Sequence, residues 1–142
     1  MLKKEIVEAK LVKLIGFLKE LNEIQPRHFE KYKTDPAIKR SCERLIQLIV
    51  ESAADINSAV ITGLGYPPPK DYYDTFIKAG ELKLLDKGLS GKIAPWAGLR
   101  NRLVHEYEDI KDRLVFEKIQ PTLINFREYV RQVEKFLERK IE

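Results

Sequence analysis

The sequence predicts an all-α protein that folds as an antiparallel bundle of about five helices in a single domain, residues 1–142. Apolar residues recur at alternating spacings of four and three along most of the 142-residue chain, which places them on one side of a helix. No segment shows the alternation of period two that a half-buried strand requires. The hydrophobic content of 44% over this length is enough to build one core.

The first expected helix covers residues 2–24 and ends before Pro26. Its apolar side is formed by Val7, Leu11, Leu14, Leu18 and Leu21. Asp35 and Pro36 then match an N-cap followed by the proline that favours the first helical position. The second helix is expected to run from there to Gly63 and Gly65, which stop it. Its apolar positions are Ile38, Cys42, Leu45, Ile49, Ser52 and Ile56.

Gly and Pro residues are concentrated in the middle of the chain. Six of the seven Gly and four of the seven Pro lie within residues 63–98. Asp71 can cap a short third helix with Gly80 at its C′ position, and residues 82–94 give a weaker helical pattern. Pro95 is expected to start a helix that reaches residue 104. A last long helix is expected from residue 112 to the end, with a bend at Pro121.

Composition excludes several classes of protein. With 26 Lys and Arg against 22 Asp and Glu, the net charge of +4 permits contact with nucleic acid but does not require it. Cys42 is the single cysteine, which excludes an internal disulfide framework and a cysteine-rich zinc site. No apolar run approaches the roughly 18 residues of a membrane span, and charges interrupt the first helical stretch. We therefore expect a cytoplasmic protein without membrane contact, metal or cofactor.

One short segment, residues 99–107, is chemically unusual because it contains Arg100, Asn101, Arg102, His105 and Tyr107. On an ideal helix Arg100 and Tyr107 fall on one stripe, whereas Arg100 and His105 diverge by roughly 140°. One straight helix therefore cannot aim both side chains at the same atom. Either the helix ends near His105 and the imidazole swings round, or two copies of the segment face each other across a symmetric dimer.

These residue types suit the cleavage of RNA without a metal ion. The guanidinium of Arg100 matches phosphate oxygens, His105 can transfer protons near neutral pH, and the ribose 2′-OH of the substrate supplies the nucleophile. The structural alternative is that Arg100 and Arg102 pair with Glu106 or with carboxylates on another helix. In that case His105 is a residue at the helix C-terminus whose positive charge suits the helix dipole.

The segment Gly98-Leu99-Arg100-Asn101-Arg102-Leu103-Val104-His105-Glu106-Tyr107 resembles the signature of the HEPN superfamily, most closely its HepT-type toxin branch. That signature is an Arg, a polar residue, three variable residues, a His, and a Tyr two positions later. Arg100, Asn101, His105 and Tyr107 match it. The resemblance extends over essentially the whole chain, since the first helix, the second helix with Glu51-Ser52-Ala53-Ala54-Asp55-Ile56, and the helix after the motif lie where the family has them.

The resemblance implies a homodimeric helical bundle with Arg100 and His105 clustered at the dimer interface. It implies a metal-independent endoribonuclease toxin in which Asn101 supports the catalytic pair. Arg102 is an extra arginine outside the signature, which either adds a phosphate contact or pairs with Glu106. The resemblance also implies a nucleotidyltransferase antitoxin that neutralises the toxin by adding AMP to Tyr107. The alternative is a non-catalytic helical partner that presents a nucleotide or substrate to the nucleotidyltransferase.

The remaining polar residues are weaker candidates. Asp55 is either a surface residue of the second helix or a carboxylate that orients Arg100 or Arg102. His28 lies in an expected connecting loop without a pattern of metal ligands around it. The tyrosines Tyr66, Tyr72 and Tyr73 flank the Pro-rich loop, either as packing for that loop or as a surface for a partner.

Overall fold

The computed structural model describes residues 2–140, except for the side chains of Tyr107 and Lys140. Within this range the chain is helical and contains no strand, so the expected all-α fold is confirmed. The elements are α1 (Lys4–Ile24), α2 (Phe29–Thr34), α3 (Pro36–Gly63), α4 (Tyr72–Glu81), α5 (Lys87–Ile93), α6 (Trp96–His105), the 3-10 turn η1 (Tyr107–Asp109) and α7 (Asp112–Lys140).

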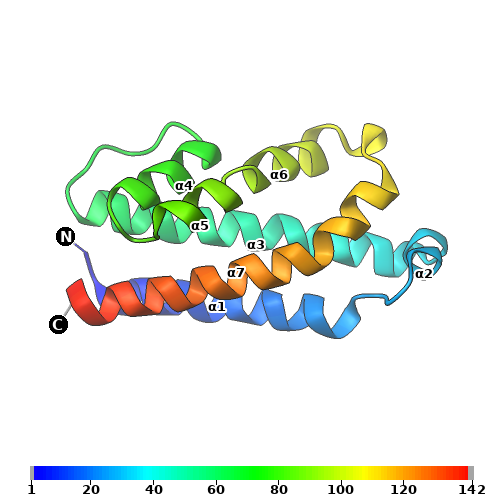
Figure 1. Ribbon diagram of the computed structural model, residues 1–142, viewed down its shortest axis with the longest axis horizontal. Helices are drawn as coiled ribbons and strands as arrows, with labels where there is room; N and C mark the ends of the chain where they lie inside the picture. Colours follow the sequence, from blue (N-terminus) through cyan, green and yellow to red (C-terminus); the bar gives the residue numbers. More distant parts are fainter. Residues whose placement is uncertain (1, 141–142) are drawn as a thin grey trace.

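Helix α3 lies in the middle of the bundle (Figure 1). Helices α1 and α7 run side by side along one side of it, while α4, α5 and α6 cover the opposite side. Both chain termini lie at one end of the molecule, and α2 lies at the other. The last helix therefore returns alongside the first, which closes the bundle around a single core.

The apolar stripes expected from the sequence form this core. The five expected positions of α1 are all buried, and so are Cys42, Leu45, Ile49 and Ile56 of α3. On α7 the stripe is supplied by Ile119, Leu123, Phe126, Val130, Val133 and Leu137. The 4-3 spacing thus gives a correct account of which face of each long helix is buried.

The capping residues that the sequence indicates hold their helices. Asp35 Oδ1 accepts hydrogen bonds from Ala37 N at 3.1 Å and Ile38 N at 3.2 Å, and Pro36 takes the first helical position. Asp71 Oδ1 accepts from Asp74 N at 2.8 Å. These bonds satisfy backbone donors that the first turn of a helix leaves without an internal partner.

Gly80 does not occupy the C′ position of α4, so that expectation is wrong. Lys83 has the left-handed backbone conformation there, with φ 64°, and its N–H bonds to Gly80 O. Gly80 lies inside α4, where the helix packs against α5. A Cβ atom at this position would lie 2.5 Å from Ser90 Oγ of α5, so only glycine fits without a shift of Ser90. Ser90 Oγ in turn donates to Phe76 O at 2.7 Å. The glycine permits close packing of α4 on α5.

The structure contains two short helices, α2 and α5, beyond the five that the sequence predicts. The six-residue α2 is too short for a periodic pattern, although it buries Tyr32 completely. The seven-residue α5 contains Gly88 and Gly91 but buries Leu89 and Ile93, so tertiary packing overrides its weak propensity. Helix α7 continues through Pro121, and a bend there stays a prediction.

Among the described residues one helix, α3, is long and apolar enough by composition to cross a membrane, with a mean hydropathy of 1.3 over its best window. Half of that window is buried inside the bundle, and α3 packs against α1, α4 and α6. These are the properties of a central core helix.

Candidate active site

Helix α6 carries the Arg-Asn-x3-His motif and packs on the core through apolar residues in successive turns. Leu99 and Leu103 are buried, and Trp96 Nε1 donates to Thr122 Oγ1 of α7 at 2.8 Å. Because this apolar stripe faces the core, residues on the flanking positions of α6 lie at its edges or at the surface. Arg100 and Arg102 are half-buried, whereas Asn101 and His105 are exposed.

The guanidinium of Arg100 is held from two sides. Its Nε and Nη2 atoms each lie 2.8 Å from Glu51 Oε2 on α3. The ring of Tyr72, the first residue of α4, lies beneath it with 4.7 Å between Arg100 Cζ and the ring centroid. Gln47 Nε2 also donates to Glu51 Oε2, at 3.0 Å. Only 17% of the Arg100 side chain is exposed, so the cation has a fixed place at the rim of the bundle.

Glu51 is the functional candidate that sequence reasoning missed, since it appears there only as part of the second helix. It borders the buried stripe of α3 and is 25% exposed as a side chain. A partly buried carboxylate on a helix facing the motif arginine is the signal that could have identified it, because such a group needs a cationic partner. The alternative that Arg100 pairs with a carboxylate on another helix is therefore confirmed.

Asp55 does not orient either arginine, which corrects that alternative. Its Oδ2 atom lies 2.6 Å from Lys10 Nζ of α1, and its side chain is 60% exposed. Glu51 precedes it by one helical turn and takes the place at Arg100 instead. Asp55 is the surface residue that the first alternative described.

His105 is the last residue of α6, and Glu106 follows as the C-cap with φ −128° and ψ 36°. The helix thus ends at the imidazole, as one of the two alternatives requires. Within the described residues, no hydrogen bond or ion pair joins His105 to Arg100. Arg100 Nη1 instead approaches the neighbouring Asn101 Oδ1, at 3.3 Å.

Tyr107 begins the 3-10 turn η1 directly after the motif helix. Its side chain lies outside the described part of the structure, so exposure of its hydroxyl stays a prediction. His28 is exposed at the start of α2. In residues 2–140 no group of three or more His, Cys, Asp or Glu side chains is arranged to hold a metal ion.

A groove of about 360 Å³ lies beside the Arg100 pair, between α1, α3 and α4. Its walls include Glu51 and Tyr72, the two residues that hold Arg100, together with Lys10, Lys13 and Phe17 of α1. The groove gives the arginine clamp an open side, on which the carboxylates of Glu51 and Asp55 balance Lys10 and Lys13 and Asp55 pairs with Lys10.

Residues 14–133 match the family described as ribonuclease HepT-like. The chain belongs to this family. It is 35% identical over 132 residues to a tRNA nuclease HepT of Aphanizomenon flos-aquae, covering 93% of this chain and 90% of that protein. It is 29% identical over 132 residues to a putative RNase of Archaeoglobus fulgidus, covering 93% and 96%. The expected HepT-type ribonuclease family is therefore confirmed over nearly the whole chain.

Solved structures show the same HepT-like fold. One is a tri-AMPylated HEPN toxin of Shewanella oneidensis in complex with an MNT antitoxin, with a TM-score of 0.84 and 20% identity, covering 94% of this chain and 99% of that one. Another is a MntA–HpeT toxin–antitoxin mutant in which a tyrosine is replaced by alanine, with a TM-score of 0.82 and 21% identity, covering 92% and 98%. At this identity the likeness establishes the helical fold alone.

Proposed function

We propose that this HepT-like protein is a metal-independent endoribonuclease toxin of a toxin–antitoxin pair that acts in the cytoplasm. The observation that carries the proposal is the fixed position of Arg100, between the Glu51 carboxylate and the Tyr72 ring, five residues before an exposed His105 on the same helix. Fixed donors aimed at developing charge stabilise a transition state more than mobile ones do. The names of the relatives, a tRNA nuclease and a putative RNase, support this reaction class.

In the proposed reaction the ribose 2′-OH attacks the adjacent phosphorus, and the bond from phosphorus to the 5′-oxygen breaks. The products are a 2′,3′-cyclic phosphate and a free 5′-OH. His105 transfers protons between the attacking and leaving oxygens, and Arg100 stabilises the additional negative charge on the phosphorane. Asn101 positions the phosphate or the imidazole, and Arg102 adds a phosphate contact. No step requires a metal ion or a cofactor.

We propose that the site is completed by a second copy of the chain. Arg100 faces α3 and α4 through its contacts with Glu51 and Tyr72, whereas His105 is exposed at the end of α6. A two-fold dimer that joins two α6 ends would bring Arg100 of one protomer to His105 of the other. This arrangement removes the 140° divergence between the two side chains on one helix.

Substitution of His105 tests the catalytic part of the proposal. We expect His105→Ala to abolish RNA cleavage with an unchanged circular dichroism spectrum, because the exposed imidazole makes no core contact. Cleavage by the wild-type protein should persist in EDTA and leave 2′,3′-cyclic phosphate ends, which gel analysis and mass spectrometry of the products detect. Equal activity of wild type and His105→Ala would contradict the mechanism.

One observation favours a second candidate function, a non-catalytic partner that binds nucleotide or substrate for a nucleotidyltransferase. Glu51 already neutralises Arg100, and an ion pair of this kind also occurs in purely structural roles. Expression without any partner protein distinguishes the two functions. A toxin should arrest growth of the host and the His105→Ala variant should not, whereas a non-catalytic partner should be harmless in both forms.

We propose Tyr107 as the residue that a nucleotidyltransferase antitoxin modifies with AMP. The S. oneidensis toxin of the same fold is AMPylated and bound to an MNT antitoxin. AMP at Tyr107, two residues after His105, would place bulk and negative charge where an RNA phosphate must sit. Tyr107→Phe should keep cleavage but escape neutralisation, and intact-mass measurement should find AMP on the wild type only. Silencing of the Phe variant together with the wild type would indicate simple occlusion instead.

A further inference from the structure

A second groove, of about 460 Å³, lies between the α4–α5 connection and the C-terminal part of α7. Five cations line it, Lys83 and Lys87 on one side and Arg131, Lys135 and Arg139 on the other. All five are exposed. We call these five residues and the surface between them the basic groove.

Three of the cations give the basic groove a regular row of positive charge along α7. Arg131, Lys135 and Arg139 recur every four residues along α7, so successive charges stand about 6 Å apart along the helix. Lys83, in the turn after α4, and Lys87, the first residue of α5, lie on the other side of the groove. Regularly repeated positive charge suits a polymer with regularly repeated negative charge better than it suits an isolated anion.

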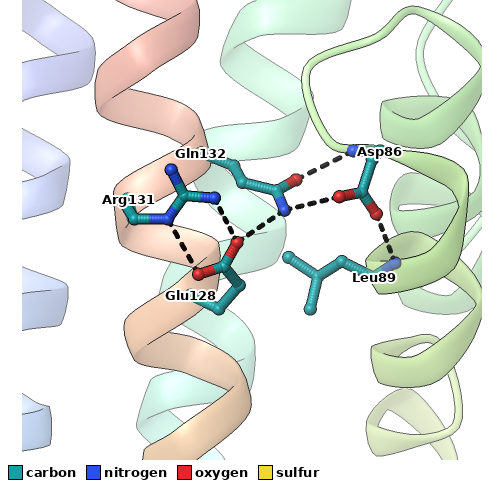
Figure 2. A network of polar contacts seen from close by, with 5 residues as sticks. All are labelled: Asp86, Leu89, Glu128, Arg131 and Gln132. Carbon is teal, nitrogen blue, oxygen red and sulfur yellow. Dashed lines mark hydrogen bonds and ion pairs between the residues drawn. The ribbon is translucent and has the colours of Figure 1, made fainter.

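Two carboxylates at the basic groove, Asp86 and Glu128, are engaged by neighbouring groups. The one carboxylate that lines it, Asp86, accepts from Leu89 N at 2.7 Å and from Gln132 Nε2 at 2.8 Å. Glu128 is bound by Gln132 at 2.8 Å and by the Nε and Nη2 atoms of Arg131. Figure 2 shows Gln132 lying between the two carboxylates. Glu134 of α7 lines a different groove, between α1 and α7.

Of the five cations, Arg131 is held by Glu128, and the other four remain available for a ligand. Among the described residues, none forms an ion pair or side-chain hydrogen bond with Lys83, Lys87, Lys135 or Arg139. With five cations against two carboxylates, Asp86 in the lining and Glu128 on Arg131, the groove carries a net charge of 5 − 2 = +3, compared with +4 for the whole chain. Most of the chain's excess of positive charge therefore lies at this groove.

The basic groove lies away from the end of the motif helix. Helix α5 and the C-terminal end of α7 lie toward the end of the molecule that holds both termini, whereas α6 runs toward the opposite end (Figure 1). A ligand that occupies both places must be extended. Within the proposed ribonuclease function, on which this inference rests, a folded RNA has the required length and its phosphates have the required charge.

We infer that the basic groove is a second RNA-binding site, which holds the phosphate backbone of a folded RNA while another part of the same molecule is cut at the α6 site. It binds without reading sequence, because lysine and arginine contacts to phosphates position a nucleic acid rather than identify bases. With this second site the protein should bind a folded RNA more tightly than a short single strand, which cannot reach both places.

Charge reversal at Lys135 tests the inference against a matched variant at Lys19. Both are exposed lysines within long helices, and Lys19 lies on α1 outside the basic groove. In the full-length His105→Ala background, which prevents cleavage, binding of unfractionated transfer RNA is measured over a range of salt concentrations. Lys135→Glu should weaken binding roughly fivefold and reduce the salt slope by about one unit. Lys19→Glu should leave both quantities near those of the parent.

The remaining outcomes distinguish this inference from the proposed function. Equal losses in the two variants would overturn it, because the effect would then follow net charge alone. Unchanged RNA binding by Lys135→Glu together with lost binding of a purified nucleotidyltransferase partner would also overturn it, since the groove would then be a protein interface. If wild-type protein cleaves no RNA but Lys135→Glu selectively weakens RNA binding, the proposed function fails and the groove stands as an RNA site.

Discussion

Arg100 depends on two residues that precede it by many positions in the chain, Glu51 on α3 and Tyr72 on α4. Glu51 contacts the Nε and Nη2 edge of the guanidinium, and the Tyr72 ring lies against its face, so the group is held on two sides. Glu51 is therefore a positioning residue in the proposed reaction, because it acts on the substrate only through Arg100. The ion pair links the fold of the bundle to the geometry of the site.

Glu51→Gln should lower kcat for RNA cleavage about tenfold with little change in KM, because Arg100 stabilises charge that develops only in the transition state. The matched control is Asp55→Asn, one turn later on the same face of α3, where the carboxylate pairs with Lys10 at the surface. Steady-state kinetics on one RNA compare the two variants. Equal losses of kcat, or a loss confined to KM, would contradict the positioning role of Glu51.

Lys83 offers a test of backbone strain at a single residue. Its φ of 64° is unfavourable for a side chain with a Cβ atom, so Lys83→Gly should stabilise the fold by about 1 kcal/mol. Lys83→Ala keeps the Cβ and should leave stability nearly unchanged. Urea unfolding measures both, and equal stabilities of the Gly and Ala variants would contradict the strain.

At the scale of single residues, sequence reasoning identified the caps Asp35 and Asp71 because a cap acts on backbone donors two or three positions away. It misassigned Gly80 and missed Glu51 because their partners, Ser90 and Arg100, are distant in the sequence. A local sequence pattern predicts contacts between residues that are close in the chain. A contact between two helices depends on how the helices are placed, which the pattern does not contain.

Polar contacts around the buried side chain of Gln132 connect the start of α5 to α7 (Figure 2). Gln132 of α7 accepts from the Asp86 backbone N–H and donates to both the Asp86 and the Glu128 carboxylates, each at 2.8 Å. Asp86 caps α5 through Leu89 N. One side chain therefore connects the start of a weak helix to a long and stable one, which compensates for the two glycines inside α5.

The Glu128 carboxylate gives this connection a pH dependence. Hydrogen bonds from Arg131, and then from Gln132, lower its pKa from 4.5 to about 2. Because the folded-state pKa lies below the ordinary value, the contribution to stability is fully present above about pH 4.5 and is lost as pH falls toward 2. The contribution is modest, under about 1 kcal/mol, since the Glu128 side chain is 38% exposed and solvent screens the pair.

Melting temperatures can be measured for both proteins between pH 2 and pH 7. At neutral pH the melting temperature of Glu128→Gln should be lower than that of the wild type. The difference should shrink as pH falls through the window between about 4.5 and 2, because protonation removes the same charge from the wild type. A gap that stayed constant over this range would show that the carboxylate charge does not contribute.

Long helices are the elements that the sequence defines best. α1, α3 and α7 each repeat the 4-3 pattern over five or more positions, so their buried faces follow from spacing alone. Helices α2 and α5 have at most two turns and cannot show a period. Leu89 and Ile93 of α5 become informative only when the packing of α5 on α4 and α7 is known.

At the scale of the whole molecule, the fold places the arginine and the histidine of one motif in different surroundings. Arg100 is clamped toward α3 and α4, and His105 is exposed beyond the last turn of α6. The divergence of these two side chains follows from helix geometry, so the sequence already indicates either a helix that ends at His105 or a site shared by two copies of the chain. The way in which two copies meet depends on surface shape, which no periodic pattern encodes.

The central claim is that Arg100 of one protomer and His105 of its partner together cut RNA without a metal ion. Arg100→Ala and His105→Ala proteins, each purified and then mixed under conditions that exchange subunits, test it in one assay with EDTA present. Each variant alone should be inactive, and the mixture should recover up to about a quarter of wild-type cleavage, because half of its dimers hold one intact site of two. A mixture as inactive as its components would contradict the composite site, and cleavage by either variant alone at the wild-type rate would contradict the mechanism itself.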